Sequence, residues 1–325
     1  MMKSILLLLL IPLRTNCFSL ITFDVDGTLV KGSGQAAAES AHARAFSHAI
    51  STVLNNSQPV ASVAEALPRQ LYHGSTDGLI LLRLAKATLG MDSKDSFAKL
   101  EEMFACMYEF MSDMDEEEIA AHITPLPGVM DHLGTLATMK DQVMCGLVTG
   151  NVEGIARKKM KAVGIYDTRA LSPPCATQRQ WVGSEQYGFL GGFGSDFCSG
   201  DIDSLERNHL DRGEQIAIAT NRCRNILNKD GNNMQQPLTR VVHVGDAPAD
   251  VLAAKWFSER QYEEHKNSKN TNDKICVGCV AVATGSYSAQ ELRDLAGEPI
   301  SGVWEPVILE EGMGDPGFLK ACGIL

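Results

Sequence analysis

Two aspartates, Asp24 and Asp26, stand one residue apart where the apolar run "LITFDV" gives way to a Gly-Thr turn. Side chains two positions apart on an extended chain point the same way, so both carboxylates should face one site. One could attack a substrate as a nucleophile while the other exchanges protons with the leaving group. Two acids this close repel each other unless a cation lies between them. The pair predicts Mg²⁺, which takes hard oxygen ligands together with a substrate phosphate.

Polar residues also follow three later apolar runs. Val143–Val148 is followed by "TGN", Val241–Val244 by "GDAPAD", and Val277–Ala283 by "TGS". None of the four runs alternates cleanly between apolar and polar residues, which indicates strands buried on both faces. Helical patterns separate three of the runs, and this alternation predicts an α/β fold with a doubly wound parallel sheet. Ligands bind at the carboxyl ends of the strands in such sheets, where all four polar segments lie.

A long segment after the first strand, residues 31–122, shows helical patterns. "QAAAESAHARAFSHAISTVL" keeps small apolar residues in phase, and Gly90 is placed to end the helix predicted for "TDGLILLRLAKATLG". The segment therefore predicts a helical domain inserted into the core. The core would be discontinuous and comprise residues 18–30 and 123–325.

Residues 1–17 differ from the rest of the chain. Lys3 precedes an apolar run from Ile5 to Leu13, and small or polar residues follow. The run is shorter than the about 20 residues of a membrane-spanning helix. It favours a cleaved signal peptide and entry into the secretory pathway, with an organelle or plastid reached through it among the destinations. The alternatives are an uncleaved leader and a misassigned start codon, which would leave the protein cytoplasmic.

The charge of the chain bears on its partners. Its 325 residues include 29 Lys and Arg against 40 Asp and Glu, a formal net charge of -11. This excess of acid argues against nucleic acid, and against an anionic membrane surface after leader cleavage. A phosphate-bearing substrate must therefore be bound by a metal ion or by oriented amides. The oligomeric state is left open.

Three motifs of the chain resemble those of a known superfamily. "FDVDGTLV" resembles the first motif of the haloacid dehalogenase-like (HAD) superfamily, "LVTGN" its second, and "VVHVGDAPADVLAA" its fourth. The helical insertion resembles the C1 cap of that superfamily, and "YHGSTDGLIL" resembles a cap segment of phosphoglycolate-phosphatase-like enzymes. The resemblance implies a Rossmann-like HAD core that carries a C1-type cap.

The resemblance also implies roles for the acids. Asp24 would attack phosphorus and become an aspartyl-phosphate, and Asp26 would protonate the leaving oxygen and then deprotonate water. The Asp24 carboxylate, the Asp26 backbone carbonyl and Asp246 would hold Mg²⁺, with Asp250 as an outer ligand or support. Asp26 argues for phosphate esters over haloacids, because a halide leaving group needs no proton.

Further residues would bind the substrate. Thr149 and the amides of Gly150 and Asn151 would contact the phosphoryl oxygens at a helix N-terminus, which favours an anion. Thr76 and Asp77, in the cap segment, could face the substrate, although Asp77 could equally cap the next helix.

The third motif, which supplies a cation, has no clear match. Many relatives carry its lysine in a "GKP" segment that this chain lacks. Helix phase places Lys159 on the inward stripe of its predicted helix and Lys158 off the centre of that stripe. Lys159 is therefore the predicted cation, with Lys158 or Arg212 as alternatives.

These features predict a Mg²⁺-dependent phosphatase of a small phosphorylated metabolite, phosphoglycolate-like or a sugar phosphate. A phosphosugar mutase of the same superfamily is the enzymatic alternative. The non-enzymatic alternative is a catalytically inactive HAD-fold binding protein.

Overall fold

A computed structural model describes residues 18–32, 41–55, 59–168, 190–229, 237–266 and 274–324. The predicted signal peptide lies outside these ranges. None of the helices within them combines the length and hydrophobicity of a membrane span.

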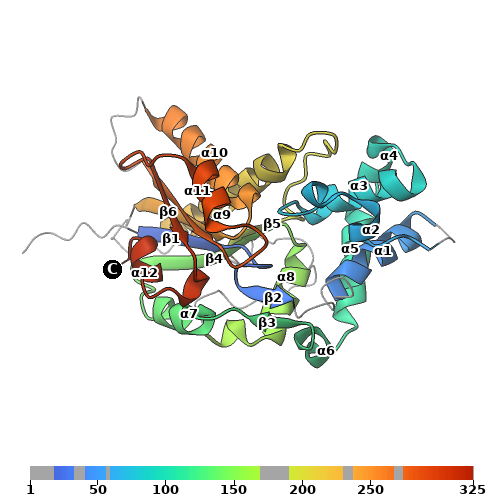
Figure 1. The fold of residues 1–325 in the computed structure, drawn as a ribbon, viewed down its shortest axis with the longest axis horizontal. Coiled ribbons are helices and arrows are strands. Elements are labelled where there is room, and N and C mark those ends of the chain that lie inside the picture. Colours follow the sequence, from blue (N-terminus) through green and yellow to red (C-terminus); the bar gives the residue numbers. More distant parts are fainter. Residues whose placement is uncertain are drawn as a thin grey trace, which may run out of the picture.

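The central sheet of the described residues has six parallel strands in the order β5-β4-β1-β6-β7-β8 (Figure 1). Their bounds are β1 Phe18–Phe23, β4 Val143–Thr149, β5 Gly191–Phe193, β6 Leu238–Gly245, β7 Cys276–Val282 and β8 Trp304–Leu309. The order reverses at β1, which pairs with β4 on one side and β6 on the other. A ligand crevice is expected at the carboxyl end of such a switch point.

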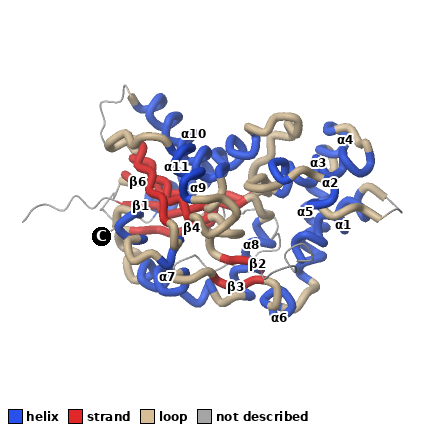
Figure 2. The backbone as a smooth tube through the Cα atoms, in the orientation of Figure 1, coloured by secondary structure: helices blue, strands red, loops and turns tan. Residues whose placement is uncertain are grey.

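Helices cover both faces of this sheet (Figure 2). They are α7 Val129–Ala137, α8 Glu153–Ala162, α9 Arg207–Lys229, α10 Pro248–His265, α11 Ala289–Ala296 and α12 Phe318–Ala321. Successive residues of β1 enter different cores: Leu20 packs in the cluster of Phe257, whereas Ile21 and Phe23 pack in that of Phe318. The predicted doubly wound parallel sheet, buried on both faces, is therefore confirmed.

The chain leaves the core through β2 (Val30–Gly32) and returns through β3 (Ile123–Pro125), which pair antiparallel. The segment between β2 and β3, called the insertion below, contains helices only among its described elements. These are α1 Ala41–Val53, α2 Val63–Ala66, η2 Arg69–Leu71, α3 Asp77–Leu89, α4 Ser93–Phe97, α5 Leu100–Ser112 and α6 Glu116–Ala120. Helices α1 to α5 stand beside the carboxyl end of the sheet in Figure 1. The status of the insertion as a separate domain stays a prediction.

Candidate active site

The turn after β1 sets the direction of the two acids. The Asp24 backbone N–H still donates to Val244 O on β6 (2.9 Å), which holds Asp24 at the carboxyl edge of the sheet. The chain then folds back, because Gly27 N–H donates to Val30 O (2.8 Å) and Val30 N–H donates to Val25 O (3.0 Å). The two aspartates therefore differ in exposure, since Asp24 is buried and Asp26 is exposed, although both line the cavity described below.

Three acids gather beneath this turn. Asp24, Asp246 and Asp250 each bring a carboxylate oxygen to within 4.8 Å of the others, and all three are buried. Gly27, with a φ of +89°, lets the turn lie against Asp246, since a Cβ there would lie 2.4 Å from Asp246 Oδ2. Burial raises the pKa of Asp246 well above its usual range, and the charges of Asp24 and Asp250 raise it further. Buried carboxylates that repel one another fit a hard divalent cation.

The Asp26 side chain is not part of this cluster. Its predicted role in metal binding was through the backbone carbonyl, and that role stays a prediction. Arg212 of α9 lies beside the three acids. Its Nη1 donates to Asp24 Oδ1 (2.8 Å) and to Asp250 Oδ1 (2.9 Å).

The Arg212 contacts affect the charge of Asp24. Burial raises the pKa of Asp24 to about 6, with Arg212 lowering it and Asp250 adding to the rise. Asp250 is also fixed by the Ala247 N–H (3.1 Å) and by His243 Nε2 (3.2 Å). The guanidinium therefore neutralises part of the acid cluster and holds Asp24 in place.

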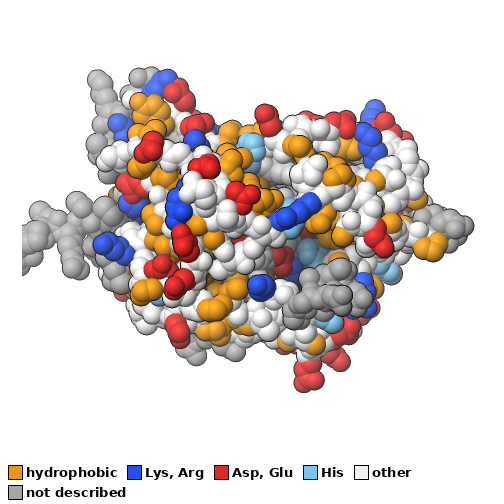
Figure 3. Space-filling view, viewed as in Figure 1, with side chains coloured by type: hydrophobic (Ala, Val, Ile, Leu, Met, Phe, Trp, Pro, Cys, Tyr) orange, Lys and Arg blue, Asp and Glu red, His pale blue; other side chains and the backbone are white. Residues whose placement is uncertain are grey.

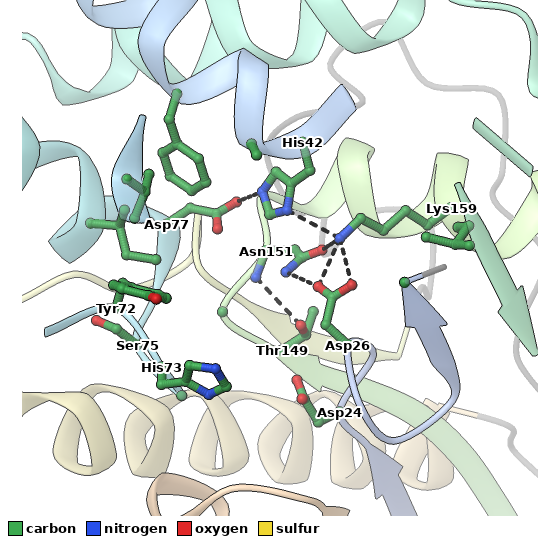
Figure 4. Close-up of a pocket in the computed structure, with 18 of the residues that line it drawn as sticks. Asp24, Asp26, His42, Tyr72, His73, Ser75, Asp77, Thr149, Asn151 and Lys159 are labelled. Carbon is green, nitrogen blue, oxygen red and sulfur yellow. Dashed lines mark hydrogen bonds and ion pairs between the residues drawn. The ribbon is translucent and has the colours of Figure 1, made fainter. Parts of the chain in front are cut away.

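The second cation contacts the other acid. Lys159 Nζ donates to both carboxylate oxygens of Asp26 (2.8 and 2.7 Å) and to Asn151 Oδ1 (2.8 Å). Asn151 Nδ2 in turn donates to Asp26 Oδ2 (3.0 Å). Partial burial by itself raises the pKa of Asp26, but the Lys159 charge and these hydrogen bonds lower it to about 2. Figure 4 shows this network, with Asp24 outside it.

The helix face predicted for Lys159 is therefore correct, because Lys159 lines the cavity and contacts Asp26. Its third-motif role stays a prediction. Lys158 turns away from the site, because its Nζ donates to the carbonyls of Ser112 (2.5 Å) and Met114 (2.6 Å). Arg212 contacts Asp24, and Lys159 contacts Asp26.

His42, on α1, was not predicted. Its Nδ1 lies 3.1 Å from Lys159 Nζ, and its Nε2 lies 3.0 Å from Asp77 Oδ2. An ammonium group has no lone pair to offer, so Nδ1 is the acceptor and the proton sits on Nε2, which donates to Asp77. The signal in the sequence was an imidazole in phase with Ala45 and Ala49 on the apolar stripe of the predicted helix.

Asp77 links the insertion to the core. Its Oδ2 also accepts the Val152 N–H (2.8 Å), and its own N–H donates to Gly150 O (2.8 Å). Thr76, not Asp77, is the N-cap of α3, since Thr76 Oγ1 accepts the Leu79 N–H (3.3 Å). The interpretation of Asp77 as the cap is therefore wrong. Thr76, predicted to face the substrate, is fully buried and does not line the pocket described below.

The segment after β4 carries the predicted phosphoryl-binding residues. Thr149, Gly150 and Asn151 all line the pocket, just before α8 begins at Glu153. Thr149 Oγ1 accepts the Asn151 N–H (3.4 Å). Gly150 is needed because a Cβ there would lie 2.3 Å from Ser75 O, on the loop of the insertion that leads into α3.

These groups line one cavity of about 470 Å³ between the core and the insertion. Asp24, Asp26, Asp246, Lys159 and Arg212 all contribute to its wall. Acidic, basic and histidine side chains are visible together in this recess in Figure 3. Asp24 is buried beside Asp246, Asp250 and Arg212, and Asp26 lies in the same cavity. Such an arrangement can support nucleophilic attack by one acid and proton exchange by another.

Residues 18–173 match the family model of the haloacid dehalogenase-like hydrolases. The chain contains a haloacid dehalogenase-like hydrolase domain. No curated protein matches the sequence.

Solved structures of haloacid dehalogenase-like hydrolases are similar to this chain over 90% to 95% of its length. A HAD family hydrolase from Deinococcus radiodurans, with bound phosphate and sodium, is 15% identical, with 95% of this chain and 97% of that chain covered and a TM-score of 0.40. A haloacid dehalogenase-like family hydrolase from Streptococcus pneumoniae is also 15% identical (90% and 94% covered, TM-score 0.39). L-2-haloacid dehalogenase from Xanthobacter autotrophicus is 16% identical (94% and 98% covered, TM-score 0.34).

Proposed function

We propose that this hydrolase is a Mg²⁺-dependent phosphatase that cleaves a small phosphate monoester through an aspartyl-phosphate. The observation that carries the proposal is the separation of the two acids. Asp24 is buried with Asp246, Asp250 and Arg212, whereas Asp26 is held by Lys159 within the same cavity. This separation supports the proposal that Asp24 attacks and Asp26 transfers the proton.

In the first step, an Asp24 carboxylate oxygen attacks phosphorus and the ester P–O bond breaks. The departing alcohol oxygen takes the proton of Asp26, and the phosphoryl group remains on Asp24. Arg212 positions Asp24 by the 2.8 Å contact with Oδ1, which leaves the other oxygen for attack. Thr149 and the amides of Gly150 and Asn151 bind the phosphoryl oxygens.

Asp26 must be protonated for this step, although its pKa is about 2 before substrate binds. A bound phosphate dianion would compete with Asp26 for the Lys159 ammonium and place a negative charge beside it. Both effects raise the pKa of Asp26 toward the protonated form. Substrate binding would thereby prepare the acid.

In the second step, Asp26 takes a proton from water as the water oxygen attacks the phosphorus of the aspartyl-phosphate. The P–O bond to Asp24 breaks, which releases inorganic phosphate and regenerates the Asp24 carboxylate. Mg²⁺ held by Asp24 and Asp246, with Asp250 in support, would neutralise charge on the phosphoryl oxygens.

The test is phosphate release by the full chain from a panel of phosphate monoesters, including 2-phosphoglycolate and glucose 6-phosphate. We expect release with Mg²⁺, its loss in EDTA and its return when Mg²⁺ is restored. Conversion of a sugar monophosphate to its isomer without free phosphate would identify a mutase instead. Phosphate release that is unaffected by EDTA would refute the metal requirement.

A further inference from the structure

The two ends of the cavity differ in chemistry. The core end carries the acids, Thr149 and the two cations, whereas the end formed by the insertion and β3 is largely apolar. Six side chains there are apolar and buried: Phe46, Val63, Ile80, Met111, Ile119 and Ile123. The phosphoryl group belongs at the charged end, so the apolar end faces the alcohol that leaves.

The cations of the cavity are already committed. Among the described residues that line it, Lys159 and Arg212 are the lysines and arginines. Lys159 Nζ contacts Asp26, Asn151 and His42, and Arg212 Nη1 contacts Asp24 and Asp250. Both belong to the core end. Hence no lysine or arginine from the described part of the insertion is available for a second anionic group on the substrate.

The serine side chains in the wall of the insertion offer at most one free O–H donor, that of Ser75, and no positive charge. Ser62 Oγ donates to Glu65 (2.8 Å), and Ser75 Oγ accepts from Arg83 (3.1 Å).

The remaining polar groups of this wall include no lysine or arginine; they are His42, Tyr72, His73, Asp77 and His122. The Nδ1 atom of His122 has no hydrogen-bond partner among the described residues and could bind a polar group of a neutral ligand. Asp77 accepts hydrogen bonds from His42 and Val152, and as an acid it would repel an anion. Burial and then the Arg69 charge lower the pKa of His73, which favours its neutral form. A carboxylate placed here would be desolvated without a cationic partner, which is costly.

We infer that the alcohol portion of the substrate has a neutral, apolar body, aromatic or branched aliphatic. A hydroxy acid or a second phosphate would not suit this end of the cavity. The inference rests on the proposed phosphatase function and names its substrate class. The cavity volume of about 470 Å³ is that of a site for a ligand much larger than glycolate. We therefore expect the phosphoglycolate-like and sugar phosphates predicted from the sequence to be poorer substrates, and they serve as comparison compounds.

Binding of two matched phosphonates tests the inference apart from turnover. Benzylphosphonate and phosphonoacetate both carry a methylene phosphonate, but one ends in a phenyl ring and the other in a carboxylate. Calorimetry on the full chain with Mg²⁺ should show benzylphosphonate binding at least about tenfold more tightly. Equal affinity, or a preference for phosphonoacetate, would overturn the inference.

Hydrolysis separates this outcome from failure of the proposed function. Benzyl phosphate and 2-phosphoglycolate are both esters of simple alcohols, and benzyl phosphate should have the higher kcat/KM. Turnover that favours 2-phosphoglycolate overturns the inference and leaves the phosphatase in place. Tight benzylphosphonate binding without hydrolysis of either ester overturns the phosphatase and supports the apolar site. If neither phosphonate binds and neither ester is cleaved, both ideas fail.

A charge placed in the apolar wall should reverse the preference. Val63 lies at the start of α2, where a longer side chain can reach the cavity. Val63→Lys should raise the affinity for phosphonoacetate and lower that for benzylphosphonate. Ala98→Lys adds the same charge on an exposed residue outside the cavity and should change neither affinity. If Val63→Lys folds by circular dichroism and the two affinities keep their ratio, the wall does not select the substrate.

Discussion

Asp24 and Asp26 are one residue apart, yet different parts of the molecule hold them. Asp24 is buried among Arg212, Asp246 and Asp250, all of which belong to the core. The Asp26 side chain is 48% exposed and is held by Lys159, which also contacts His42 of the insertion. Figure 4 shows the second network extending upward to α1 while Asp24 stays below it.

In the proposed mechanism, this difference separates the acid that attacks from the acid that transfers a proton. A displacement of the insertion would remove His42 from Lys159 and so alter the environment of Asp26. The contacts of Asp24 would stay as they are, because none comes from the insertion among the described residues. The geometry therefore predicts a nucleophile independent of the insertion and an acid that responds to it.

The largest effect should come from the nucleophile. Asp24→Asn should lower kcat by at least about 10³-fold, since an amide cannot form the aspartyl-phosphate. Steady-state phosphate release measures it, with circular dichroism to verify folding. Turnover near that of the wild type would show that another group is the nucleophile, and the proposed difference in role between Asp24 and Asp26 would be wrong.

The next effect concerns the stability of the buried cluster. Arg212→Met leaves Asp24 and Asp250 without their shared cation and should cost about 3–5 kcal/mol of unfolding free energy. The control is Arg260→Met, whose partners Glu214 and Glu264 are partly exposed, with an expected cost below about 1 kcal/mol. Urea unfolding in EDTA compares the two. Equal midpoints would show that Arg212 does not stabilise the acids.

Adjacent lysines test the region around Asp26. Lys159→Met should lower kcat about 10- to 100-fold, because Asp26 loses its charged partner. Lys158→Met changes a residue that donates to the carbonyls of Ser112 and Met114, away from the site, and should leave kcat within about twofold. Similar losses in both variants would mean that Lys159 acts only through folding.

The smallest effect is a difference in pH dependence. The pKa of Asp24 is raised to about 6, so its contribution to stability is full below about pH 4 and is lost as the pH rises through about 6. The pKa of Asp26 is lowered to about 2, so its contribution is present above about pH 4 and is lost as the pH falls through about 2.

Unfolding in EDTA between pH 2 and 7 measures these opposite slopes. Relative to wild type, Asp24→Asn should gain about 2–3 kcal/mol of stability as the pH rises from 4 to 7. Asp26→Asn should lose less than about 1 kcal/mol as the pH rises from 2 to 4, because the side chain is half exposed and solvent screens it. Slopes of the same sign would contradict the two environments.

The sequence predicted the parts that backbone geometry determines. Carboxyl ends of parallel strands meet at one edge, so Asp24, Thr149 and Asp246 had to converge, and helix phase sufficed for Lys159. Side chains brought in by tertiary packing left weaker signals. Arg212 reaches the acids from α9, at a distance in the chain that no spacing rule predicts.

The errors in the insertion have a similar cause. The pairing of His42 with Asp77 depends on how α1 packs beside α3, and no local pattern encodes it. Thr76 and Asp77 are adjacent polar residues before a helix, and either could have capped it. The structure gives the cap to Thr76 and leaves Asp77 for the site.

The antiparallel pair of β2 and β3 has an evolutionary consequence. Val30 lies opposite Pro125, so the chain departs from the core and rejoins it at one spot. The segment between those two strands could be exchanged for one of another length or shape while β1 and the contacts of Asp24 stay in place. Selection for a new substrate could thus proceed by replacement of this segment while the catalytic floor stays conserved.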